Sequence, residues 1–231
     1  MALINDVYEG LKKLFQKSNR GWISPDEFNS AANYAQTKIV RESFDYMDSV
    51  RNRQKIGRAG KIDYDKLKLA KETVRKLSSS ATLTFDDPNF DYPSDYMLLE
   101  NIYFGQRRVE EISPSERNIL HNDFVSPSEN YPVFLEHGDY IEIIPDTITS
   151  GVTMYYYKNF VTPKWTYVTT SSRPIFNQGA SDFQDFIVPD LVYDELMVEM
   201  AKYLSLELKQ PDIAQVMDKE DSKNEQLKRE Q

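Results

Sequence analysis

Residues 140–165 read YIEIIPDTITSGVTMYYYKNFVTPKW, and two segments of this stretch alternate with the period of two that is typical of β-strands. In residues 140–145 successive side chains point to opposite faces, and residues 152–157 repeat the pattern. Gly151, in the connection, can take the positive φ that a turn requires. Pro163 lacks a backbone donor, so the second strand is expected to end before it. The stretch therefore predicts a hairpin at the centre of a β-rich domain.

Helical signals lie on both sides of these strands. Apolar residues recur at steps of three and four in residues 3–16, 62–77 and 190–208. Ser24-Pro25-Asp26-Glu27 has the composition of a capping box with proline at the first helical position, which predicts a helix to about Arg53. Asp190 is the expected N-cap of the last helix. After Pro211 the sequence is almost without apolar residues, so this tail is expected to be frayed or disordered without a partner.

Short runs of β-branched and aromatic residues between turn signals predict further strands. They are residues 82–85, 97–104, 107–112, 133–136 and 165–168. Gly138-Asp139 is a tight-turn signal before the strand that begins at Tyr140. A second capping box at Ser113-Pro114-Ser115-Glu116 predicts a short helix through Leu120, and residues 171–182 are expected to form a polar connection.

These patterns together predict an α+β protein, in which an antiparallel β-sandwich or barrel-like sheet is flanked by N-terminal and C-terminal helices. The predicted divisions are a helical region in residues 1–80, a β-rich domain in residues 81–189, and a C-terminal helix with a polar tail in residues 190–231. Ser78-Ser79-Ser80 is expected to close the helical region. A chain of 231 residues with 40% apolar and 13% aromatic residues can fill a core of this kind.

The overall composition narrows the classes of function. No apolar run approaches the roughly 20 residues of a membrane span, and the N-terminus lacks the pattern of a signal peptide, so we expect a soluble protein made in the cytoplasm without membrane contact. The chain has no cysteine and two histidines, which argues against disulfides, thiolate catalysis and most zinc sites. The net charge of −9 is distributed unevenly along the chain, with about +6 in residues 1–80 and about −15 in residues 81–231.

Residues that could carry chemistry are present but do not form a recognisable constellation. The carboxylate pairs that come nearest to a glycosidase arrangement are Asp91 with Asp95 and Glu110 with Glu111. His121 and His137 have no nucleophile in a triad-like setting, and the chain has no glycine-rich phosphate loop. We therefore predict no catalytic residue, no cofactor and no metal site.

Basic residues are concentrated in residues 51–76. The predicted basic surface begins with Arg51, Arg53, Lys55, Arg58 and Lys61. Such a run is either a contact surface for an acidic protein or nucleic acid, or a solvated loop and helix face. It contains none of the interleaved aromatic residues that stack on single strands, so a dedicated nucleic-acid-binding domain is not predicted.

Two groups of apolar and aromatic residues are candidate assembly contacts. They are Leu3, Val7, Leu11 and Leu14 on the first helix, and Tyr155, Tyr157 and Trp165 in the strand region. In an extended strand Tyr155 and Tyr157 share one face and Tyr156 lies on the other, so the run can form a patch on one side only. Tyrosine and tryptophan are favoured at half-buried subunit contacts, although an aromatic-rich sheet core would explain them equally well.

The order of these signals resembles the head-to-tail adaptor, or neck ring, proteins of tailed bacteriophages, especially those of short-tailed phages including the crAss-like group. The segments that carry the resemblance are Tyr92-Pro93-Ser94-Asp95-Tyr96, Gly138-Asp139, Ile143-Ile144-Pro145, Tyr155-Tyr156-Tyr157-Lys158, Pro163-Lys164-Trp165 and Pro189-Asp190-Leu191. The resemblance covers a little over half of the chain and consists in how these segments are organised along it. The basic helical N-terminal third is less typical of the family.

The resemblance implies a virion structural protein, made in the host cytoplasm, that is not an enzyme and needs no cofactor. It would form a homo-oligomeric ring, commonly of twelve copies, beneath the portal protein, contact other neck and tail proteins and continue the DNA channel. The first helix and the tail after Pro211 would then contact neighbours or the portal. The basic surface would meet an acidic partner ring or the DNA in the channel.

Two alternatives come from other classes of function. One is a carbohydrate- or receptor-binding tail module, suggested by the tyrosines and Trp165. The other is a hydrolase that uses the scattered carboxylates. A sugar-binding module requires exposed aromatic rings in an open groove, whereas a hydrolase requires carboxylates that face each other in one cleft.

Overall fold

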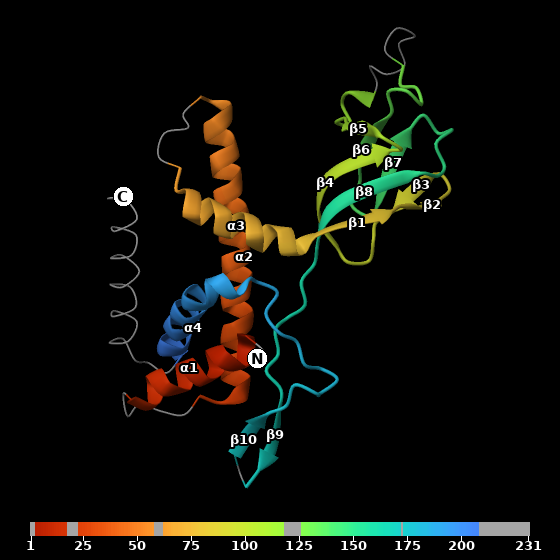
Figure 1. The fold of residues 1–231 in the computed structure, drawn as a ribbon. Coiled ribbons are helices and arrows are strands. Elements are labelled where there is room, and N and C mark those ends of the chain that lie inside the picture. Colours follow the sequence, from red (N-terminus) through yellow and green to blue (C-terminus); the bar gives the residue numbers. More distant parts are fainter. Residues whose placement is uncertain (1–2, 18–22, 58–61, 118–125, 172, 208–231) are drawn as a thin grey trace. The chain divides into compact units, whose positions relative to one another are not determined.

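The computed structural model describes residues 3–17, 23–57, 62–117, 126–171 and 173–207. The chain forms two compact units, which we call the helical unit, Met1–Lys76 with Phe160–Gln231, and the sheet unit, Leu77–Asn159 (Figure 1). The sequence pattern had placed residues 160–189 with the strands. In the structure this segment belongs to the helical unit, so the chain enters and leaves the sheet unit once.

The helical unit contains four α-helices in its described residues. These are α1 (Leu3–Lys17), α2 (Pro25–Lys55), α3 (Tyr64–Leu77) and α4 (Tyr193–Glu207), the last preceded by the short 3-10 helix η2 (Asp190–Val192). The capping box at the start of α2 is confirmed, because Ser24 and Glu27 exchange side-chain and backbone hydrogen bonds. The prediction that Asp190 is an N-cap is wrong: Pro189 holds the cap position of η2 without a side-chain hydrogen bond, and Asp190 lies inside the turn.

The core of the helical unit lies where α4 packs against both α1 and α2. The face of α2 that contributes to this core carries small side chains, since Ala31, Ala32 and Ala35 are all fully buried. Small side chains allow helix axes to approach closely. Gly10 has the same effect in α1, because a Cβ atom at this position would lie 2.7 Å from the Tyr193 hydroxyl of α4.

Two amide side chains of α2 fix the segment that returns from the sheet unit. Asn29 accepts from the Trp165 backbone N–H at 2.8 Å and donates to its carbonyl at 3.3 Å. Two turns further along, the fully buried Gln36 donates to the Val161 carbonyl at 3.2 Å and accepts from the Ile187 N–H at 3.0 Å. These four hydrogen bonds are partly buried, and the two amides supply the partners that backbone groups need where water has limited access.

The described residues of the sheet unit form eight strands. They are β1 (Ser78–Thr82), β2 (Thr84–Asp86), β3 (Asn89–Asp91), β4 (Tyr96–Phe104), β5 (Arg107–Glu111), β6 (Val133–Glu136), β7 (Tyr140–Ile144) and β8 (Val152–Lys158). They are arranged in the order β1-β8-β4-β5-β6-β7-β3-β2, and all neighbours are antiparallel except β5 and β6 (Figure 1). The fold is therefore α+β, as predicted.

The two ends of this sheet come from one continuous stretch of chain. Strands β1 and β2 are separated only by Leu83, a core residue whose N–H donates to the Val152 carbonyl at 2.9 Å. The sheet consequently nearly closes on itself, like a barrel. Its interior is filled by the inward-facing aliphatic and aromatic residues, which are Leu83, Phe90, Ile102, Val109, Phe134, Ile141, Ile143, Ile148, Val152, Met154 and Tyr156.

The predicted hairpin between residues 140–145 and 152–157 is wrong, although both strands exist. Strand β7 pairs with β6 and β3, whereas β8 pairs with β1 and β4. Ile141 and Met154 do face the same core, but from different parts of the sheet. The period of two indicates which side chains point inward, and it carries no information about the neighbouring strand.

Two local predictions also need correction, and a third is tested only in part. Ser78-Ser79-Ser80 was expected only to close the helical region. In the structure it forms most of β1, in which exposed and half-buried side chains alternate. The expected polar connection contains a strand, β10 (Arg173–Phe176), which pairs with β9 (Tyr167–Thr170) in a separate hairpin. The second capping box forms the Ser113 N–H to Glu116 bond at 2.7 Å. Residues 114–116 form a turn, Arg117 has 3-10 helical conformation, and residues 118–120 of the predicted helix lie outside the described residues.

Candidate assembly surfaces and a tyrosine-lined pocket

The predicted assembly contacts on α1 are largely occupied by the chain itself. Val7 and Leu11 are fully buried in the helical unit, and Leu3 and Leu14 are half-buried. The reason is that the apolar stripe of α1 packs on α4, which sequence periodicity could not distinguish from packing on a second molecule. The tail after Pro211, a further predicted contact, lies outside the described residues.

Trp165 is also a core residue of the helical unit, with 1% of its surface exposed. Its indole stacks on Tyr8 of α1 with ring centroids 4.0 Å apart, and its Nε1–H donates to the Asn5 side chain at 3.1 Å. Burial with a satisfied N–H is the usual environment of a structural tryptophan. Trp165 is therefore not presented to a ligand, and the sugar-binding alternative loses this residue.

The β9–β10 hairpin presents apolar side chains to solvent. Every residue of β9 is exposed, and Val168 and Ile175, which oppose each other across the two strands, are 53% and 51% exposed. Tyr167 and Phe176, on the other face, stack on Trp165 with ring centroids 5.7 and 6.0 Å away. The base of the hairpin is thus anchored in the helical unit, while Val168 and Ile175 on its outer face are left about half exposed by the residues that the structure describes. Sequence reasoning missed this surface because it treated residues 171–182 as a polar connection.

Basic residues cover the C-terminal end of α2 and the outer side of α3. We call this the basic helix surface; its exposed members are Arg51, Arg53, Lys55, Lys66, Lys68, Lys71, Arg75 and Lys76. A small apolar cluster that includes Val50 and Leu67 joins the two helices, so their charges are adjacent. Of the other predicted members, Arg58 and Lys61 lie outside the described residues.

Ion pairs neutralise only part of the basic helix surface. Arg75 contacts Glu72 at 2.7 Å, and Arg51 lies 3.9 Å from Asp48. Within the described residues Lys68 and Lys71, three positions apart on α3, have no carboxylate partner. Exposed cations of this kind on one helix face create a positive potential that attracts an anionic partner.

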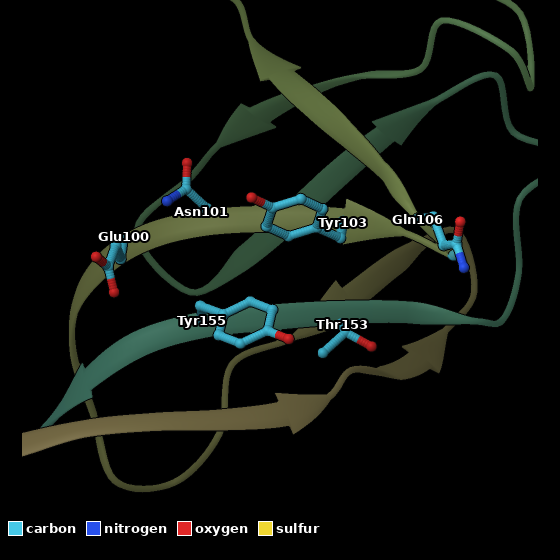
Figure 2. A pocket seen from close by; sticks show the side chains of 7 residues that line it. Glu100, Asn101, Tyr103, Gln106, Thr153 and Tyr155 are labelled. Atoms are coloured by element: carbon cyan, nitrogen blue, oxygen red, sulfur yellow. The ribbon is translucent and has the colours of Figure 1, made fainter.

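The outer face of β4 and β8 carries a shallow pocket of about 480 Å³. It is lined by Glu100, Asn101, Tyr103, Gly105, Gln106, Thr153 and Tyr155 (Figure 2). The strand register brings these residues together, because Asn101 is opposite Tyr155 and Tyr103 is opposite Thr153. The predicted faces of the tyrosine run are confirmed: Tyr155 is exposed, Tyr157 is half-buried on the same side, and Tyr156 is buried in the core.

A second group of tyrosines binds carboxylates at one end of the sheet unit. Tyr96 donates to Glu136 at 2.6 Å and stacks on Tyr92 with ring centroids 4.4 Å apart. Burial first, and then the adjacent Glu136 carboxylate, raises the pKa of Tyr96 well above its ordinary value. Burial and Asp95, which accepts from the Tyr156 hydroxyl at 2.7 Å, likewise raise the pKa of Tyr156. These carboxylates act as hydrogen-bond acceptors that hold tyrosines in place.

The carboxylates singled out in the sequence do not share a described cavity as pairs. Glu110 and Glu111 are successive residues of β5, so their side chains leave opposite faces of the strand. Asp91 is an exposed residue of β3, and Asp95 holds Tyr156. His137 stacks on Tyr140 with ring centroids 4.5 Å apart, and His121 lies outside the described residues.

Among the described residues, no three acidic or histidine side chains are grouped so that they could hold a metal ion. No helix in that part of the chain is long and apolar enough to cross a bilayer. No protein-family model matches the sequence, and no curated protein matches it.

Proposed function

We propose that this protein is a structural subunit of the head-to-tail connector of a tailed bacteriophage, where it forms a ring between the portal and the tail. The sequence resemblance described above is the starting point of the proposal. It implies a ring, commonly of twelve copies, in the neck of the virion, with the portal and other neck proteins as neighbours. In this function the chain acts by shape and has no catalytic role.

The observation that carries the proposal is the β9–β10 hairpin. A two-stranded hairpin is marginally stable by itself in water, and this one leaves the opposed pair Val168 and Ile175 uncovered. An adjacent subunit that covers this pair would remove apolar surface from water and hold the hairpin in one conformation. In a ring the covering surface is a different part of the neighbouring copy, because head-to-tail contacts between unlike surfaces generate rings when the rotation closes.

The distribution of charge supports the same function. The basic helix surface faces solvent in a protein whose residues 81–231 carry about −15. An acidic neighbouring ring or the DNA in the channel would complement this surface, and opposite charge would accelerate docking more than it would add affinity. The tail after Pro211 remains a predicted contact element in this proposal.

The test is the assembly state of the full chain, alone and with the portal protein, measured by native mass spectrometry and electron microscopy. We expect closed rings, and we expect Val168→Asp to prevent them because it places a charge in the interface. Leu191→Asp is the matched control, since Leu191 is 72% exposed in the same unit but outside the hairpin. A chain that stays monomeric with the portal, or rings that are insensitive to Val168→Asp, would contradict the proposal.

A further inference from the structure

The pocket on the outer face of β4 and β8 has a composition that ring assembly does not explain. Tyr103 and Tyr155 meet edge to face, with ring centroids 5.5 Å apart and an interplanar angle of 80°. Tyr155 keeps 43% of its surface exposed, so a large part of its ring is open to a ligand. Figure 2 shows Glu100 and Asn101 at one end of this ring pair and Gln106 at the other. The pocket therefore offers aromatic surface in the middle and planar polar groups at both ends.

The polar side chains of the pocket have no partners in the part of the chain that the structure describes. No hydrogen bond or ion pair there engages the side chains of Glu100, Asn101, Gln106 or Thr153, or the hydroxyls of the two tyrosines. Both amides can donate and accept at the same time, and the hydroxyls can do either. By contrast, Tyr96 and Tyr156, elsewhere in the same unit, use their hydroxyls on carboxylates of the chain. The pocket groups are thus available to a ligand.

The charge of the pocket limits the class of ligand. None of the described residues that line the pocket is a lysine, arginine or histidine, so these residues offer no countercharge to a phosphate or carboxylate ligand. Glu100 is the one carboxylate among these described lining residues, which is too little for a bare metal ion. The pocket favours a neutral ligand that has an apolar face and a rim of hydroxyl groups.

We infer that this pocket binds a neutral saccharide. A pyranose ring presents axial C–H groups on its faces and hydroxyls around its edge, which matches an exposed tyrosine ring flanked by amide and hydroxyl side chains. The volume of about 480 Å³ lies within the usual range for small-ligand sites and suits a short oligosaccharide. In this assignment Tyr155 stacks on the sugar ring, while Asn101 and Gln106 bind hydroxyls at the two ends.

The first experiment is saturation-transfer NMR with the full chain and three neutral probes, namely maltotriose, cellotriose and mannotriose, each at about 10 mM so that weak binding is detected. We expect transfer to the C–H protons of at least one trisaccharide. Shift changes in the labelled chain should map to β4 and β8. Absence of transfer from all three probes, or shift changes elsewhere in the chain, would overturn the assignment.

Variants then test the individual roles. We expect Tyr155→Ala to lower the affinity about tenfold or more, and Tyr155→Phe, which keeps the ring, to lower it less. Asn101→Ala should also weaken binding. The matched control is Tyr131→Ala, since Tyr131 is 80% exposed in the same unit but does not line the pocket. Equal affinities for Tyr155→Ala and Tyr131→Ala would refute the proposed stacking.

A rival occupant of this face is a second copy of the chain, because tyrosine-rich faces also form protein contacts. In that case Tyr155→Ala would change the assembly state and no trisaccharide would bind, which would overturn the saccharide assignment. The result does not depend on the proposed connector function. Val168→Asp tests ring assembly through a different unit, so either proposal can fail without the other.

Discussion

Replacing Gln36 by methionine tests whether its amide holds the returning segment against α2. Methionine fills a similar volume, but it can neither donate to the Val161 carbonyl nor accept from the Ile187 N–H, which Gln36 reaches at 3.2 and 3.0 Å. A buried polar group that loses its partner costs about 1–3 kcal/mol. Both backbone groups are only partly shielded from water, so we expect the free energy of unfolding of the helical unit to fall by about 2–3 kcal/mol in total.

Urea denaturation monitored by tryptophan fluorescence provides the measurement. In a Trp22→Phe background Trp165, which is buried in the helical unit, becomes the only tryptophan and reports on that unit. We expect a lower midpoint with an unchanged slope, since the surface exposed on unfolding stays the same. Gln54→Met is the matched control, because Gln54 is exposed on the same helix. A loss of less than about 0.5 kcal/mol at position 36, equal to an ordinary surface change, would refute the reasoning.

Three further predictions concern other contacts. Asp185→Ala should destabilise the helical unit by about 1–2 kcal/mol in thermal unfolding, because Asp185 accepts from the first two described N–H groups of α1 at 3.0 and 2.8 Å; an unchanged transition would contradict this. Gly10→Val should cost about 1–3 kcal/mol in the same assay, since the ends of the Tyr193 and Met197 side chains must shift to admit the new side chain. The folded-state pKa of Tyr96 is raised, so its contribution to stability is complete below pH 10 and is lost as the pH rises further. Circular dichroism between about pH 9 and 12 should show a smaller alkaline loss for Tyr96→Phe, and equal losses would exclude this cause.

Local signals in the sequence located most of the elements. The start of α2 could be predicted because Ser24 and Glu27 lie within one turn and satisfy each other's backbone groups. The positions of β7 and β8 could be predicted because their inward side chains alternate. In these elements the physical cause is contained in a few consecutive residues.

The pairing of strands and the assignment of residues 160–189 could not be predicted, because they depend on partners far away in the chain. Ser80 lies opposite Tyr155 in the register, and nothing in either segment indicates the other. Asn29 and Gln36 appeared to be ordinary polar helix residues, and only the structure shows that they bind the returning segment.

The candidate sites depended on distant partners in the same way. Trp165 was predicted to be a contact residue, yet Tyr8 and Asn5 of α1 enclose it. Conversely, Tyr155 was predicted to be a contact residue, and it is exposed in the structure. The pocket in which it lies is formed only because Tyr103 and Asn101 of β4 are paired with β8. The exposure of an aromatic residue is decided by tertiary packing, and its residue type alone does not determine it.

The position of the sheet unit within the chain has a consequence for biosynthesis. Its two ends are already paired, Ser78 with Tyr157, so the whole sheet can form as soon as residues 77–159 have left the ribosome. The helical unit has to wait, because α1 and α2 are made first whereas α4 is made last. Until then the buried alanines of α2 are exposed on a nascent chain. We therefore expect the middle of this polypeptide to fold before its beginning.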